Sequence, residues 1–508
     1  MLTAFTDFLR LIKIAWVLAR HDALIPHEFA PMVPGSVRLV GKIMRLGTRT
    51  KGQRPGERLA KALAGLGPAY VKFGQVLATR PDVVGRQMAD DLRALQDRMA
   101  PFPTDMAKAE IERSLGQPAE ALFSQFSDAV AAASIAQVHK AETHDGRMVA
   151  VKVLRPGIEQ KTRKEFRVLL LGAKMAQGLV PSARRLEPVK FIKTLTEASA
   201  LELDLRIEAG SASELRENLA SFEDIVVPQV DWQHSSRRVL TLEWISGTPL
   251  SDINAVAAAG HNRPYLAVLV MRSFLTQALE YGFFHADMHQ GNLFVDENGR
   301  LVLIDFGIMG RLDEMARRVF AEIILGFIRR DYRAAAKAHF DAGYVPPHFN
   351  VEAFATALRA VGEPIFNKRA DELDMSRVMQ QLFDVTDVFD MHLRPELVLL
   401  QRTMVVVEGV ARILDPKIDL WSTAEPVVRS YLEREVGLKA FARKAKANAE
   451  AAVSLIDAFP EFAQAAEAMA GQLSNGGLKL SDDTITRLAR ALKGKSLHDD
   501  QPGEAGNS

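Results

Sequence analysis

The amino-acid sequence predicts an α+β protein in two lobes, in which a small strand-rich lobe precedes a large helical lobe. β-Branched and apolar runs bounded by turn residues gather between residues 126 and 250 and predict short strands there. From residue 251 to 437 the pattern is helical, apart from two short apolar runs. A helical extension at residues 61–125 precedes both lobes, and a membrane-associating segment at residues 1–60 precedes the extension. Residues 438–508 predict an Ala- and Lys-rich helical region with a disordered tail.

Turn residues mark the individual strands and helices. Asp145 and Gly146 predict a hairpin, and Asn298 and Gly299 predict a type I′ turn in the helical lobe. A single long helix is expected from about residue 188 to 219. The predicted strands are residues 149–153, 225–230, 238–245, 293–295 and 301–304.

Composition narrows the functional classes. The 508 residues are 48% hydrophobic and 25% charged, as in a folded protein rather than a disordered one. The 64 Lys and Arg balance the 63 Asp and Glu, so the net charge says nothing about nucleic acid or acidic substrates. No nucleic-acid partner is expected. The chain has no cysteine, which excludes disulfides, thiolate metal sites and a cysteine nucleophile.

The N-terminal segment predicts an amphipathic helix. Its apolar residues recur at helical spacing, while Arg10 and Lys13 interrupt them, and nowhere in the chain do about 18 uncharged apolar residues follow one another. Two interpretations stay open: a helix packed on the protein, or a helix lying in a membrane interface. A basic run follows that either is solvated or meets anionic lipid. The apolar residues are Phe5, Phe8, Leu9, Ile12, Trp16 and Ala19, and the basic ones Arg38, Lys42, Arg45, Arg49, Lys51, Arg54, Arg58 and Lys61.

Three short motifs in a fixed order point to phosphoryl transfer from ATP. Lys152 lies in a Val-Ala-Val-Lys strand, where its ammonium would reach the α and β phosphates. Asp287 and Asn292 have the spacing of the Asp and Asn in the kinase catalytic loop, so Asp287 would take the proton of the acceptor and Asn292 would bind a metal ion. Asp305 opens an Asp-Phe-Gly sequence and would hold Mg²⁺. The segment Glu243, Trp244 and Ile245 fits the hinge that binds adenine through its backbone.

Further motifs resemble those of the UbiB family of atypical kinase-like proteins, over nearly the whole length up to about Trp421. Lys72 and Gln75 match its K-x-G-Q motif, and Glu202 and Asp204 match its E-x-D motif. Glu208 fits the helix glutamate that pairs with the strand lysine, on the same helical face as Asp204. An Ala-rich loop replaces the glycine-rich phosphate cover of ordinary kinases; its residues are Ala131, Ala132, Ala133, Ser134, Ile135, Ala136, Gln137 and Val138.

The resemblance implies a two-lobed protein-kinase-like fold that binds ATP and Mg²⁺ and supports ubiquinone biosynthesis at a membrane. The partners implied are a lipid surface and either the enzymes of that pathway or its isoprenoid precursors, and a homodimer is left open. Lys72 would reach the acidic residues of the site and take a catalytic part, while its helix obstructs docking of a protein substrate. Slow ATP hydrolysis is expected. The expected location is peripheral, on the cytoplasmic face of the inner membrane, unless a C-terminal anchor has been lost.

Two other functions compete with the ATPase. One is a nucleotide-binding scaffold without catalysis. The other is a hydroxylase, with His285 and Asp287 as the start of a two-histidine, one-carboxylate iron site and His339 or His348 as the third ligand.

Overall fold

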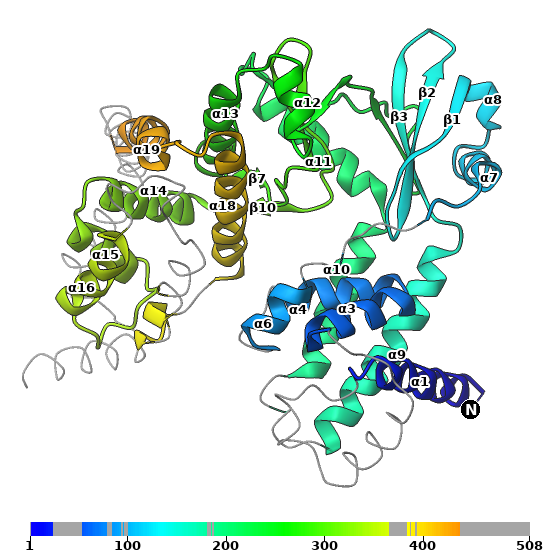
Figure 1. Ribbon diagram of the computed structural model, residues 1–508, viewed down its shortest axis with the longest axis horizontal. Helices are drawn as coiled ribbons and strands as arrows, with labels where there is room; N and C mark the ends of the chain where they lie inside the picture. Colours follow the sequence, from blue (N-terminus) through cyan, green and yellow to red (C-terminus); the bar gives the residue numbers. More distant parts are fainter. Residues whose placement is uncertain are drawn as a thin grey trace, which may run out of the picture. The chain divides into compact units, whose positions relative to one another are not determined.

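The computed structural model in Figure 1 describes residues 2–23, 53–78, 84–92, 95, 100–179, 184, 187–364, 381, 384–386, 388–391 and 394–436. The chain divides into two compact units, Met1–Arg429 and Ser430–Ser508. In the second unit, the described residues are the C-terminal part of helix α19 (Leu420–Val436). The region predicted at residues 438–508 lies outside the described residues.

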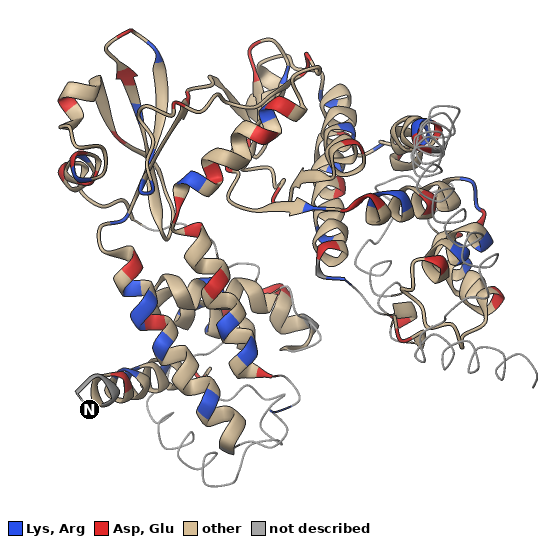
Figure 2. Ribbon diagram, turned by 180° about the vertical axis from the view of Figure 1, so that it is seen from behind, with Lys and Arg blue, Asp and Glu red and all other residues tan. Residues whose placement is uncertain are grey.

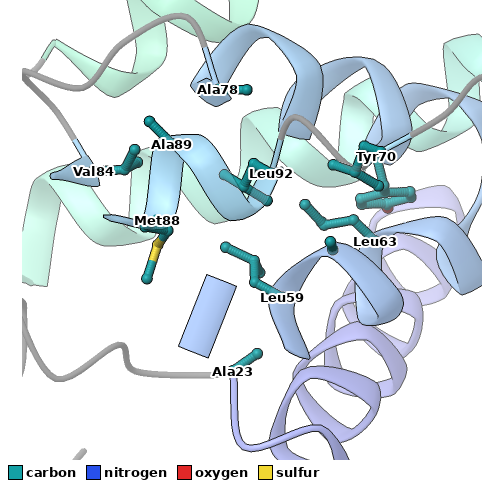
Figure 3. Close-up of a cluster of buried hydrophobic side chains, with 11 residues drawn as sticks. Ala23, Leu59, Leu63, Tyr70, Ala78, Val84, Met88, Ala89 and Leu92 are labelled. Carbon is teal, nitrogen blue, oxygen red and sulfur yellow. The ribbon is translucent and has the colours of Figure 1, made fainter. Parts of the chain in front are cut away.

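One apolar core joins the helices of the N-terminal extension (Figure 3). Leu59 and Leu63 lie four residues apart on α3, so the helical period places both on the face that meets α4 and α6. A Cβ at Gly74 of α4 would lie 2.3 Å from Leu95 Cδ1 and 2.7 Å from Leu63 Cδ1. Glycine therefore allows α4 to approach this core closely. The helices are α1 (Leu2–Arg20), α3 (Pro55–Leu66), α4 (Pro68–Ala78) and α6 (Arg86–Leu92), followed later in the chain by α9 (Ile158–Leu179) and α10 (Pro188–Glu202).

Helix α1 has one face on the protein and one face in solvent. Asp7 Oδ2 forms an ion pair with Nε of Arg167 on α9 at 3.3 Å, and Ala19 is fully buried. On the opposite face, large apolar side chains at helical spacing remain exposed. They are Phe5, Phe8, Leu9, Ile12 and Trp16.

The strand-rich lobe holds an antiparallel sheet in the order β1-β2-β3-β5. Val149, Val151 and Val153 of β3 are buried against α7 (Thr104–Leu115) and α8 (Ala119–Leu122). Because side chains alternate along a strand, Lys152 points to the opposite face of the sheet. In the register, Lys152 lies between Val138 and Leu240. The strands are β1 (Phe123–Ala132), β2 (Ala136–Thr143), β3 (Met148–Leu154) and β5 (Val239–Glu243).

The helical lobe carries two small sheets that shape its loops. One has the order β4-β9-β8-β6, and the other pairs β7 with β10. Its strands are β4 (Ile225–Val226), β6 (Gly247–Pro249), β7 (Phe283–His285), β8 (Leu293–Asp296), β9 (Leu301–Leu303) and β10 (Met309–Arg311). The helices are α11 (Leu205–Asn218), α12 (Ile253–Ala258), α13 (Arg263–Thr276), α14 (Glu314–Ile328), α15 (Tyr332–Asp341), α16 (Val351–Gly362) and α18 (Pro395–Leu414), with a π-helical turn at Gln277–Tyr281.

Two local predictions are wrong. The single helix at 188–219 is two helices, because Asp204 has extended backbone angles and caps α11 by accepting from Arg206 N–H. The turn after β8 is not type I′, since Gly299 has a positive φ of 79° and Asn298 is not among the residues with positive φ. Gly299 N–H donates to Asp296 O, as in a three-residue hairpin loop with glycine in the left-handed position. Asp145 and Gly146 do form a hairpin turn between β2 and β3, as predicted.

Gly310 of β10 offers a test of the packing that supports the loops. A Cβ there would lie 2.2 Å from Cζ of Phe284, which is fully buried on β7. We expect Gly310→Ala to lower the free energy of unfolding by about 1–3 kcal/mol, because the ring has no free space to move into. Urea unfolding measures the change. Gly409→Ala is the control, because a Cβ there meets no atom within 4 Å; equal effects of the two substitutions would contradict this packing.

Candidate functional site

Lys152 connects three segments that are distant in the sequence. Its Nζ donates to Glu208 Oε1 at 2.7 Å and Oε2 at 2.9 Å, and to Asp305 Oδ1 at 3.3 Å. Lys152 belongs to β3, Glu208 to the first turn of α11, and Asp305 follows β9. The structure therefore brings together the predicted strand lysine, its helix glutamate and the predicted metal ligand.

The Lys152 ammonium and the two carboxylates of this triad shift one another's pKa values. Burial alone would lower the pKa of Lys152, but Asp305 and Glu208 outweigh it and raise that pKa. The Lys152 ammonium holds the pKa of Asp305 below its usual range. Burial raises the pKa of Glu208, and Lys152 counteracts that shift. Lys152 thus stays protonated at neutral pH and faces an ionised Asp305, whose side chain is 51% exposed and open to a ligand.

Asn292 and Asp305 meet because β8 and β9 form a hairpin. Asn292 directly precedes β8, Leu293 pairs with Leu303, and Ile304 N–H donates to Asn292 O at 3.0 Å. Asn292 Nδ2 donates to the backbone oxygen of Asp287 at 3.0 Å. Because its amide nitrogen is so engaged, the side-chain oxygen of Asn292 is the group that a metal ion could use.

Asp305 also has an unusual backbone. Its φ is 62°, in the left-handed region, which costs a non-glycine residue on the order of 1 kcal/mol. Such a conformation persists where the surroundings impose it, and it occurs often at functional sites. Here it accompanies the contact between the Asp305 carboxylate and Lys152.

His285 supports the catalytic loop from within. It is fully buried, its Nδ1 accepts from Asp287 N–H at 3.1 Å, and its Nε2 contacts Ile304 O at 3.0 Å. Because Nδ1 accepts, Nε2 carries the proton and donates it, so the ring is neutral; burial lowers the pKa of His285 accordingly. Asp287 itself is partly exposed, and His289 Nε2 lies 3.7 Å from its Oδ2.

The iron-site interpretation is wrong, because both ring nitrogens of His285 are bonded to the backbone. His339 lies in a separate apolar cluster, where its Nδ1 contacts Ala335 O at 2.8 Å and burial lowers its pKa to about 4. The ring of His348 lies against Phe349. No group of three or more His, Asp or Glu side chains that could hold a metal ion occurs in the part of the chain that the structure describes.

The Ala-rich segment is a tight hairpin between β1 and β2. Ala131 pairs with Val138 and Ala132 with Gln137, and Ala133 N–H donates to Ala136 O at 2.8 Å. Ser134 and Ile135 form its tip. The Gln137 side chain is buried and bonds both backbone groups of Phe102, so it has a structural role. Whether Ala131, Ala132, Ala133, Ser134, Ile135, Ala136 and Val138 contact ATP stays a prediction.

Lys72 of α4 lies against the E-x-D segment. Its ammonium forms an ion pair with Glu202, the last residue of α10, and these side chains line a small pocket with Ser134 and Ile135. Asp204 is paired with Arg206 instead of Lys72: Arg206 Nε donates to its Oδ1 at 2.9 Å and Nη2 to its Oδ2 at 2.7 Å. Arg206 lowers the pKa of Asp204.

The remaining predicted residues are Gln75 and those of the hinge segment, and their positions say less about the site. Gln75 Nε2 lies 3.5 Å from Leu95 O, too far for a strong hydrogen bond. In the hinge segment, Glu243 N–H donates to Gln229 O and Trp244 N–H to Met148 O, so these two donors are already used. Ile245 follows them in the segment between β5 and β6.

Much of the basic N-terminal run lies outside the described residues. Of its three described members, Arg54 binds Glu57 and Asp91, Arg58 is buried with Asp22, and Lys61 is exposed. Both arginines therefore form ion pairs within the extension. In the described residues, no helix is long and apolar enough to cross a bilayer.

Sequence reasoning missed Arg155. Its guanidinium donates to Ala133 O from Nε at 3.0 Å and from Nη2 at 2.9 Å. The only signal was a long cationic side chain directly after the β3 strand, which does not reveal its partner.

A lysine held by two carboxylates, an asparagine at the start of the hairpin that leads to the second carboxylate, and an aspartate in a loop are the parts that phosphoryl transfer requires. Two family models match the chain: an ABC1 atypical kinase-like domain at residues 94–339 and a UbiB helical domain at residues 358–419. Fold and site together thus define an atypical kinase-like protein, as the sequence predicted.

Curated relatives identify the family. A probable protein kinase UbiB from Marinobacter nauticus is 40% identical over 439 residues, covering 85% of this chain and 80% of the relative. One from Edwardsiella ictaluri is 42% identical, covering 78% of this chain and 75% of the relative. The chain belongs to the UbiB family. Its fold also resembles that of Rv3197 from Mycobacterium tuberculosis, solved in complex with erythromycin, with a TM-score of 0.51, 23% identity, and coverage of 79% of this chain and 99% of that one.

The triad makes a testable claim about the charge of Lys152. Glu208→Gln removes one of the two carboxylates that raise its pKa, so the amine should deprotonate at lower pH. We expect faster acylation of Lys152 by an amine-reactive reagent at pH 8–9, quantified by mass spectrometry. Glu214→Gln is the control. Glu214 lies on the same helix as Glu208 but is the partner of Arg311, so this substitution should leave the acylation rate unchanged. Equal rates in wild type and Glu208→Gln would exclude Glu208 as a determinant of this pKa.

Proposed function

We propose that this protein is an ATP- and Mg²⁺-dependent atypical kinase or ATPase that supports ubiquinone biosynthesis at a membrane surface. The observation that carries the proposal is the contact of Lys152 with both Glu208 and Asp305. In a kinase-like fold, a lysine so oriented binds the α and β phosphates while the aspartate binds the metal. The membership in the UbiB family supports the pathway.

The residues around the triad fit a magnesium ion. Mg²⁺ binds proteins through one or two oxygen ligands and completes its shell with phosphates and water. The Asp305 carboxylate and the Asn292 side-chain oxygen would supply the protein ligands. When bound, the ion would supply positive charge that neutralises the charge developing on the phosphate oxygens.

Asp287 would act on the acceptor. As the acceptor oxygen bonds the γ-phosphorus and the bond to the β-phosphate oxygen breaks, ADP leaves and the acceptor proton passes to the Asp287 carboxylate. Asn292 Nδ2 lies 3.5 Å from Asp287 Oδ2, and the Asp287 side chain remains 37% exposed. Because α4 and the loop tip line one pocket with Glu202, we propose that water or a small acceptor receives the phosphoryl group more readily than a peptide does.

Asp305→Asn tests the ATP site. The substitution keeps the shape of the side chain and removes the charge that would hold Mg²⁺, so we expect most of the thermal stabilisation by MgATP to disappear. Thermal unfolding with increasing MgATP measures it. Asp341→Asn, at an exposed position at the end of α15, should keep the full shift.

The outcomes separate the alternatives. A full shift in Asp305→Asn would remove this residue from the site. A wild type that binds MgATP but releases no phosphate, with or without membranes, would favour the scaffold without catalysis. Rapid phosphorylation of an added peptide would make the protein an ordinary protein kinase.

The exposed face of α1 supports the proposed membrane surface. Phe8 and Trp16 are 46% and 49% exposed, and Arg20 lies 4.7 Å from the centre of the Trp16 ring. Aromatic rings with flanking cations suit the boundary between lipid headgroups and acyl chains.

Helix α9, on which α1 lies, adds positive charge. Figure 2 shows Lys and Arg along this helix, and Lys161, Arg163 and Lys164 are exposed. Each cation close to an anionic surface contributes about 1 kcal/mol to binding. We therefore propose that α1 inserts its apolar face while α9 supplies cations.

Liposome cosedimentation tests this surface. Replacing Phe8 and Trp16 together by Asp should lower binding to phosphatidylglycerol vesicles at least about tenfold, because two apolar side chains no longer enter the lipid. Val130→Asp is the control, since Val130 is 53% exposed but lies on β1. Unchanged binding by the double variant would assign membrane association to another part of the chain.

A further inference from the structure

Arg155 fixes the Ala-rich hairpin to two other segments. Its Nε and Nη2 converge on the carbonyl oxygen of Ala133 at 3.0 and 2.9 Å, and Nη2 also donates to Ala100 O at 2.8 Å. Its own backbone N–H donates to Ile135 O at 2.8 Å. The ring of Phe102 lies 5.4 Å from the guanidinium carbon. One side chain thus holds the hairpin, the start of the segment before α7 and the end of β3 together.

A second contact holds the base of the same hairpin. Gln137 is 1% exposed; its Oε1 accepts from Phe102 N–H at 2.9 Å, and its Nε2 donates to Phe102 O at 3.2 Å. Both attachments lead to residues 100–102. The hairpin is therefore held at its base by Gln137 and near its tip by Arg155.

The hydrogen bonds of the hairpin limit where a phosphate can bind. Ala133 N–H donates to Ala136 O, and Ala133 O accepts from Arg155, so both backbone groups of Ala133 are used. Among the hydrogen bonds of the described residues, none engages the N–H of Ser134 or Ile135. These two are the donors at the tip that remain for an anion, and Arg155 determines where they lie.

We infer that Arg155 is a positioning residue for nucleotide: by holding the Ala133 carbonyl, it fixes the tip amides of the phosphate cover. The inference rests on the proposed function, because it takes the Ala-rich hairpin as that cover. Alanine side chains leave the loop less backbone freedom than glycines would, but they do not select one position. The planar guanidinium of Arg155 does fix one position of the loop, because its rigidly arranged donors bind the carbonyl oxygens of Ala133 and Ala100 at once.

Three variants of the full chain test the role. Arg155→Ala removes the contact, and Arg155→Lys keeps the charge but loses the planar fork. Arg147→Ala is the control, because Arg147 lies at the β2–β3 turn and binds Asp145 and Asp231. Hydrogen exchange of the peptide spanning residues 128–138, without nucleotide, measures the loop itself. Titration with MgATP and MgADP measures the consequence.

We expect Arg155→Ala to exchange at least about tenfold faster in the hairpin and to lose at least about tenfold in MgATP affinity, with Arg155→Lys between it and wild type. MgATP affinity should fall more than MgADP affinity, because the cover acts on the terminal phosphates. N-ethylguanidine, but not ethylamine, should restore part of the affinity of Arg155→Ala. A merely destabilised protein would not respond to the shape of the added cation.

Each other outcome is decisive. Unchanged hydrogen exchange of the hairpin in Arg155→Ala would overturn the clamp, that is, the fixing of the hairpin by Arg155. Faster exchange with unchanged MgATP affinity would show that the position of the hairpin does not affect nucleotide binding. The ATP site itself would still be tested by the thermal titration of Asp305→Asn with MgATP. A wild type that binds no MgATP would refute the proposed function, and the exchange measurement would then report on the clamp alone. Faster exchange in Arg147→Ala as well would reduce Arg155 to a general contribution to sheet stability.

Discussion

The position of Lys152 between two carboxylates is the constraint on which the site depends. A largely buried ammonium is tolerated only when charged partners replace its water, so β3, α11 and the segment after β9 must meet at one point. The remaining features follow from that meeting. Asp305, which contacts the ammonium, has a left-handed backbone, and Ile304, just before it, forms hydrogen bonds with both Asn292 and His285.

The break between α10 and α11 extends this constraint to the N-terminal extension. Glu202 before the break binds Lys72 of α4, whereas Glu208 after it binds Lys152 of β3. The capping residue Asp204 lies between them and is held by Arg206. A displacement of α4 would therefore act on α10, one short turn away from the triad. The extension is linked to the site through ion pairs as well as through apolar packing.

The predictions that failed share a cause. Residues 188–219 carry a continuous helical pattern, and the two acidic residues four apart fit one face of it. Asp204 nevertheless ends the helical geometry, because aspartate is a strong N-cap and Leu205 N–H donates to Arg237 O across the lobe. The iron-site interpretation failed similarly: His285 and Asp287 have suitable spacing, but the backbone of Asp287 and of Ile304 engages both ring nitrogens.

The sequence by itself determined the order of the parts: a lysine on a Val-rich strand, a loop aspartate and asparagine, and an aspartate directly after a short hairpin. Strand alternation and hairpin closure are local, so they already imply that Lys152 faces away from the valine core and that Asn292 meets the start of the Asp-Phe-Gly segment. The family resemblance implied a pairing of Glu208 with the strand lysine and a contact of Lys72 with acidic residues, but the physical cause of the long-range pairs lies in the tertiary structure. Lys152 forms an ion pair with Glu208, Lys72 forms one with Glu202, and Arg155 donates to the carbonyl oxygen of Ala133. Residue spacing cannot predict such pairs, because their geometry depends on how separate helices and strands pack to bury their apolar faces.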